Sequence, residues 1–111
     1  MIIRTIEIPP DTPAYFIEFS DRSQTVAVGL QQTLRHIAVA VQDADADPSM
    51  PMPERVYRLL HVAGEGWRFA PVELRLGGLS IPNEHGFSSF DVELFAGEMR
   101  LGHTTGTVVR L

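Results

Sequence analysis

The chain has 111 residues, enough for one hydrophobic core but too few for two, so we expect a single domain over residues 1–111. Hydrophobic residues make up 44% of the chain and charged residues 21%, which excludes a disordered tail and indicates a folded globular protein. The chain contains no cysteine and no lysine, which excludes disulfides, thiolate metal ligands, cysteine nucleophiles and lysine Schiff bases.

The net charge is −5, and the nine basic residues are arginines spread along the chain. A nucleic-acid partner would require a basic patch, so we expect none. No apolar run approaches the roughly 20 residues that span a bilayer, and the first residues lack the features of a signal peptide. We therefore expect a cytoplasmic protein with no membrane partner.

Apolar residues alternate with polar ones through the first 30 residues, which predicts short strands. Pro9-Pro10 ends the first of these strands, and residues 21–23 form a turn after the second. The alternating positions are Ile6 and Ile8; Tyr15, Ile17 and Phe19; and Val26, Val28 and Leu30.

The next segment has two interpretations. Ile37, Val39 and Val41 alternate, which predicts a fourth strand. The alternative is a helix over residues 28–42. Several β-branched residues in the second half of this segment and Gly29 in the first half favour the strand.

The acidic run over residues 43–54 (DADADPSMPMPE) resembles a calcium-binding loop in its spacing. Its acidic residues occupy the first, third, fifth and twelfth positions, which supply oxygen ligands in such a loop. The sixth position requires glycine for a sharp turn but holds Pro48. We therefore interpret the run as a solvated surface loop.

The apolar residues of 54–63 also fit two structures. Pro53 could start a short helix that Gly64 ends. The same residues fit a strand that continues through a hairpin at 64–66 into residues 67–72.

From residue 72 onward the pattern is that of strands. Turns are predicted at Gly77-Gly78 and Ala96-Gly97, and the β-branched residues 104–111 predict a terminal strand. The alternating positions are Val72, Leu74 and Leu76, and then Phe90, Val92 and Leu94.

Seven or eight short strands at spacings of about 8–12 residues predict a mainly β domain, as an antiparallel sandwich or barrel. One short helix near residues 54–63 fits this fold. The alternative is an α+β fold with a helix near 28–42.

Four histidines occur, at positions 36, 61, 85 and 103, and none has the spacing of a known metal motif. Glu84 and His85 are the candidate catalytic pair, because a carboxylate beside an imidazole can tune a general base. A polar surface loop is the competing interpretation. The candidate metal ligands are His36, His85 and His103.

Residues 34–43 (LRHIAVAVQD) resemble the opening strand of the vicinal oxygen chelate, or glyoxalase-like, family. The resemblance covers about ten residues and does not identify the family of this chain. It implies that His36 binds a divalent metal ion. In such an enzyme His85 or His103, with Glu84 or Glu93, would complete the site, and the metal would polarise a small oxygenated substrate.

No nucleophile elbow and no phosphate-binding loop occurs in the chain. We therefore expect a non-enzymatic binding module without a cofactor, which binds a protein partner, its own copies or a small apolar ligand. The metal-dependent enzyme, with a divalent metal ion as cofactor, is the alternative. Four aromatic residues could line a ligand pocket, although the core is their more usual place. They are Trp67, Phe69, Phe87 and Phe90.

The C-terminal residues 104–109 are uncharged and favour a strand. At a sheet edge such a segment either promotes aggregation or pairs with another strand, because no lysine protects it. Symmetric pairing satisfies both copies, so we expect a homodimer.

Overall fold

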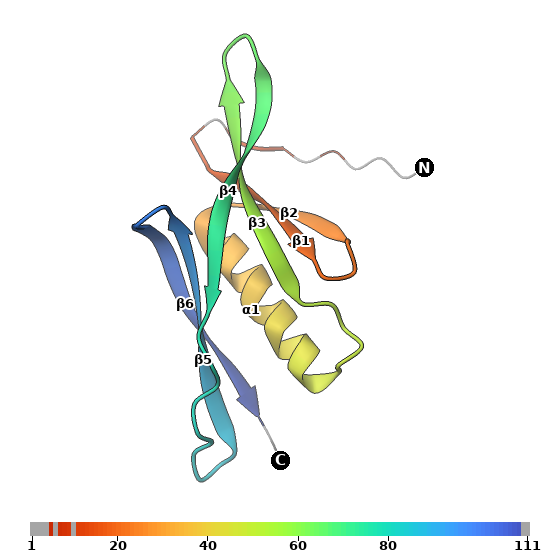
Figure 1. Cartoon of the computed structure of the whole chain (residues 1–111), viewed down its shortest axis with the longest axis vertical. Coiled ribbons are helices and arrows are strands. Elements are labelled where there is room, and N and C mark those ends of the chain that lie inside the picture. Colours follow the sequence, from red (N-terminus) through yellow and green to blue (C-terminus); the bar gives the residue numbers. More distant parts are fainter. Residues whose placement is uncertain (1–4, 6, 10, 110–111) are drawn as a thin grey trace.

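A computed structural model of the chain describes residues 5, 7–9 and 11–109. The described residues form six strands and one helix, and the strands make one antiparallel sheet in the order β2-β1-β3-β4-β5-β6 (Figure 1). The prediction of a mainly β fold with a helix is confirmed. In chain order the elements are β1 (Ala14–Phe19), β2 (Gln24–Val28), α1 (Leu30–Ala46), β3 (Pro53–Val62), β4 (Gly66–Leu76), β5 (Phe87–Ala96) and β6 (Met99–Val109).

Three hairpins connect neighbouring strands of the sheet. The β1–β2 turn includes Arg22 with a φ of 69°, the β3–β4 turn contains Gly64 with a φ of 79°, and the β5–β6 turn contains Gly97 with a φ of 61°. Glycine adopts this left-handed backbone without steric cost, which is why two of these turns were predictable from the sequence. The predicted turns at 21–23, 64–66 and 96–97 are confirmed.

The helix α1 covers one face of the sheet, which we call the inner face; the opposite face is the outer face (Figure 1). Its fully or partly buried residues recur at helical spacing and form a continuous stripe. These residues are Leu30, Thr33, Leu34, Ile37, Ala38 and Val41. They pack on alternate residues of the strands, among them Ile17, Val56 and Val92.

The sheet consists of two parts that share few backbone contacts. β3 and β4 pair over seven residue positions, whereas β4 and β5 pair over only four, from Glu73 with Phe95 to Leu76 with Val92. α1 contacts strands of both parts, most extensively β6. We conclude that the helix joins the two parts through its apolar stripe.

Two glycines of β6 allow this close packing on the inner face. A Cβ at Gly102 would lie 2.8 Å from a methyl group of Leu30 and 3.0 Å from one of Leu34. A Cβ at Gly106 would overlap the ring of Phe90, which is buried in the core. A side chain at Gly106 would therefore collide with the core, and one at Gly102 would displace the ends of two leucine side chains of α1.

The structure corrects several predicted boundaries. The strand predicted for Ile37, Val39 and Val41 is wrong, because this segment lies in α1. The alternative prediction, a helix near 28–42, agrees better with the position of α1. The short helix near 54–63 is also wrong, since residues 54–62 lie in β3, which pairs with β4 and, as far as Leu59, with β1. Leu30 starts the helix instead of ending a strand.

Two further predictions fall near the ends of elements. Among the residues of the first predicted strand, Ile6 lies outside the described residues and Ile8 is not in a strand. The acidic run is partly helical, because Asp43 and Asp45 lie in the last turn of α1 and the loop begins at Asp47.

Within the described part of the chain, no helix is both long and apolar enough to cross a membrane.

Candidate functional site

The strand β6 forms one edge of the sheet, and β5 is its only strand neighbour among the described residues. The backbone groups of Ser89 in β5 bond to Ser80 in the preceding loop, so they point away from β6. Since Ser89 lies opposite Thr107, the N–H and C=O of Thr107 point away from β5 as well. Every second residue of a strand directs its backbone groups to the same side, so those of Thr105 and His103 also point away from β5.

A groove of about 530 Å³ runs between this edge and α1. Gln42 of the helix spans it and donates a hydrogen bond of 2.9 Å from Nε2 to the carbonyl oxygen of Thr107. Residues Thr104, Thr105 and Gly106 form the strand side of the groove. The outward carbonyl of Thr107 is thus satisfied within the chain, whereas no described residue forms such a bond with the outward backbone groups of residues 103 and 105.

The outer face of β5 and β6 is polar. His103 Nε2 lies 3.0 Å from Asp91 Oδ1, and the Thr105 hydroxyl donates to the same oxygen at 3.4 Å. The hydrogen bond from His103 holds the pKa of the Asp91 carboxyl below its usual value. Arg100 Nη1 lies 3.3 Å from Glu93 Oε2 on the same face. These groups are exposed, so they contribute little to stability but keep the outer face beside the edge hydrophilic.

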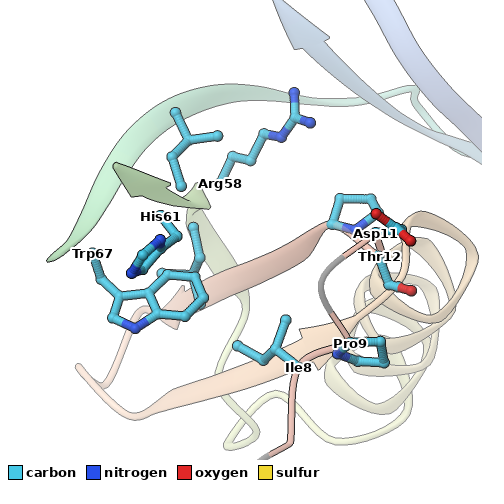
Figure 2. Close-up of a pocket in the computed structure, with 10 residues that line it drawn as sticks. Ile8, Pro9, Asp11, Thr12, Arg58, His61 and Trp67 are labelled. Carbon is cyan, nitrogen blue, oxygen red and sulfur yellow. The ribbon is translucent and has the colours of Figure 1, made fainter. Parts of the chain in front are cut away.

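A second hollow lies beside the end of β3, near its hairpin with β4. β1 begins at Ala14, opposite Leu59, whereas β3 continues to Val62 at the tip of its hairpin with β4. The described residues before β1 (8, 9 and 11–13) lie outside the sheet at this point, and the Thr12 N–H donates to the Pro9 carbonyl at 3.1 Å. The space between this segment and the end of β3 is a cavity of about 500 Å³ (Figure 2).

The walls of this cavity combine apolar and charged side chains. Arg58, His61 and Trp67 come from the β3–β4 hairpin, and Ile8 and Asp11 from the segment across the cavity (Figure 2). Pro9, Thr12, Pro13, Leu59 and Leu60 complete the lining. The rings of His61 and Trp67 meet edge to face at a centroid distance of 5.1 Å.

Three aromatic residues cluster on the outer face of β1, β3 and β4. The ring of Phe16 lies 6.1 Å from that of Tyr57 and 5.4 Å from that of Phe69. Phe69 remains 56% exposed because α1 covers only the inner face. Of the aromatic residues considered from the sequence, Phe90 is in the core as expected, whereas Trp67, Phe69 and Phe87 are exposed.

The candidate metal and catalytic residues meet only in two separate pairs, His85 with Glu84 and His103 opposite Glu93 in the β5–β6 register. His36 is exposed on α1, His85 lies in the loop before β5, and His103 lies on the outer face of β6. His85 Nε2 is 3.3 Å from Glu84 Oε1, and both side chains are largely exposed. Over the described ranges, no group of three or more histidines and acidic residues is placed to hold a metal ion.

Residues 34–43, which resemble the opening strand of the glyoxalase-like family, are helical in this protein. No family model matches the chain, and neither a curated protein nor a solved structure matches it.

Proposed function

We propose that this protein is an interaction module whose β6 edge pairs with the β6 edge of a second copy. The observation that supports this proposal is the position of β6 at the sheet edge, with outward backbone groups at His103 and Thr105. Strand addition to such an edge is a common mode of protein association, because each added backbone pair forms hydrogen bonds.

The bond between Gln42 and Thr107 selects a register for this pairing. If the two-fold axis passes beside Thr104, His103 of each copy lies opposite Thr105 of the other, and these two pairs supply four backbone hydrogen bonds. The carbonyl of Thr107 then keeps its bond to Gln42. A closed two-fold pair also leaves neither β6 edge open to further addition.

The side chains at this edge suit an identical partner. Residues 104–109 carry no charge, so two copies meet there without like-charge repulsion. The groove beside α1 has room for the side chains of an incoming strand. A cytoplasmic location remains our expectation for this dimer, in keeping with its lack of cysteine.

Light scattering tests the proposal directly. The wild-type protein should have twice the 12.3 kDa mass of one chain at micromolar concentration. Thr105→Pro removes an outward N–H and should give a monomer, because proline is tolerated where the N–H faces solvent and the ladder to β5 stays intact.

A proline on the opposite edge of the sheet is the matched control. In β2 the backbone groups of Ser23 and Gly29 bond inward, to Phe19 and Pro13, so the Gln24 N–H faces away from β1. Gln24→Pro should leave the dimer mass unchanged. A wild-type protein that is monomeric across the micromolar range would refute the proposal.

A further inference from the structure

The cavity beside β3 contains a cationic side chain that the described residues leave without a counterion. Arg58 is partly buried, and its Nε atom is enclosed with no hydrogen-bond partner within the described part of the chain. No ion pair is formed between Arg58 and the Asp11 carboxylate that lines the same cavity. The enclosed Nε donor carries an energetic cost, and no carboxylate neutralises the charge of the guanidinium, so this position favours an anionic ligand.

We propose that this cavity binds a small aromatic monocarboxylate, with the carboxylate at Arg58 and the aromatic ring against Trp67. The proposal does not depend on dimer formation, since the cavity is lined by the β3–β4 hairpin and by residues 8, 9 and 11–13, whereas the proposed interface is at β6.

The position of the cavity explains how it can hold both ends of such a molecule. Beyond Leu59 the free edge of β3 has no strand beside it in the described structure. Arg58 projects on the inner side of this edge, on the same face as its neighbour Tyr15, and His61 projects on the outer side with Trp67. All three side chains nevertheless line the same cavity at the free end of β3, so a ligand that wraps around this end can contact the guanidinium from one face and the rings from the other.

Two features select a carboxylate over a phosphate. The fork of the guanidinium matches the two oxygens of a carboxylate in a bidentate arrangement. Asp11 lines the same cavity, and the chain has a net charge of −5. Both disfavour a dianion more than a monoanion.

Two other features select an aromatic body. Trp67 is 53% exposed, an unusually open position for a large ring, and it forms a wall of the cavity with His61. Ile8 and Leu60 add apolar surface to the lining. A volume of about 500 Å³ lies within the range of small-molecule sites, and a ring of the size of benzene fills the apolar part.

The only tryptophan of the chain is Trp67, so its fluorescence reports on this cavity alone. We would titrate the protein with 3-phenylpropionate, with the neutral 3-phenylpropanamide and with inorganic phosphate. The carboxylate should give a saturable change in fluorescence. The amide should bind at least about tenfold more weakly, since a charge-assisted hydrogen bond is lost. Phosphate alone should give no saturable change.

Arg58→Met should weaken the binding of 3-phenylpropionate at least tenfold and leave the weak binding of the amide unchanged. The matched control is Arg68→Met in the same hairpin, because Arg68 pairs with Glu65 at the surface and does not line the cavity. It should bind 3-phenylpropionate like the wild type. Arg58→Met should also melt no lower than the wild type, because it removes a buried N–H donor without a partner.

Three results would overturn the proposal: no saturable change with 3-phenylpropionate, equal affinity for the carboxylate and the amide, or equal affinity of Arg58→Met and wild type for the carboxylate. Should Arg58→Met fail to fold, Arg58 has a structural role, and the comparison of carboxylate with amide on the wild-type protein still decides the ligand class.

Discussion

The close packing of Gly106 against Phe90 predicts a large effect from the smallest substitution. In Gly106→Ala the new methyl group would overlap the Phe90 ring, which is only 3% exposed and is surrounded by the core. The ring cannot move outward without displacing its neighbours, so the β6 strand or the ring must shift.

The expected loss follows from typical overpacking costs. Inserting a methyl group into a filled core costs about 1–3 kcal/mol, and alanine recovers about 0.4–1 kcal/mol by restricting the unfolded chain. At this chain length each kcal/mol changes the melting temperature by roughly 4–6 °C. We therefore expect Gly106→Ala to melt several degrees, and up to about 10 °C, below the wild type, as measured by calorimetry.

Gly78→Ala is the matched control for this experiment. A Cβ at Gly78 meets no atom within 4 Å, and its backbone is not left-handed, so alanine should leave the melting temperature unchanged or raise it slightly. The double mutant Gly106→Ala/Phe90→Leu should be more stable than the sum of the two single effects predicts, because the smaller side chain makes room for the methyl group. A Gly106→Ala protein that melts with the wild type would refute the packing argument.

Two further predictions concern ionisable side chains. Burial raises the pKa of the Tyr15 hydroxyl above 10, and the charge of Arg58 opposes this effect only in part. The unfolded chain ionises at about pH 10, so the contribution of Tyr15 to stability is complete below that pH and is lost as the pH rises through the folded pKa. Tyr15→Phe should therefore lose stability less steeply above about pH 10 in denaturant titrations, and an unchanged slope would contradict this. Asp43→Asn should raise the melting temperature slightly, because Asp43 places a negative charge in the last turn of α1, where the helix dipole is negative. Calcium should not change the melting temperature of either protein; a calcium-dependent rise in the wild type would show that the acidic run binds the ion.

The helix shows where local propensity misleads. Its β-branched residues Ile37, Val39 and Val41 favour a strand by propensity, yet Leu30, Leu34, Ile37, Ala38 and Val41 lie at the spacing of one helical face. In the fold this face fills the inner side of the sheet, and burial outweighs a propensity difference of a few tenths of a kcal/mol per residue. The helical spacing was visible in the sequence and was the better signal.

The cavity could not have been predicted in the same way. Arg58 alternates with apolar residues in β3, as many surface arginines do, and nothing in its sequence neighbourhood distinguishes it from Arg55 or Arg68. The cavity beside it depends on where β1 begins, because a longer β1 would fill the space beside Leu60 and His61. Trp67 was a candidate pocket residue from the sequence, but Ile8 and Asp11, which line the cavity with it, lie far earlier in the chain.

Both proposed binding sites lie where a strand, or part of one, has no strand neighbour in the described structure. β1 has six residues and β3 has ten, so the end of β3 lacks a strand neighbour where the cavity lies. β6 has eleven residues and borders only β5 among the described strands, so its outward backbone groups lack a ladder except where Gln42 reaches Thr107. The exposed apolar side chains at the first site favour a ligand, and the outward backbone groups at the second site favour an added strand. If the sites are independent, Thr105→Pro should abolish the dimer while leaving the affinity of the cavity for 3-phenylpropionate unchanged, and Arg58→Met should do the reverse; a variant that abolished both would show that the cavity forms only in the dimer.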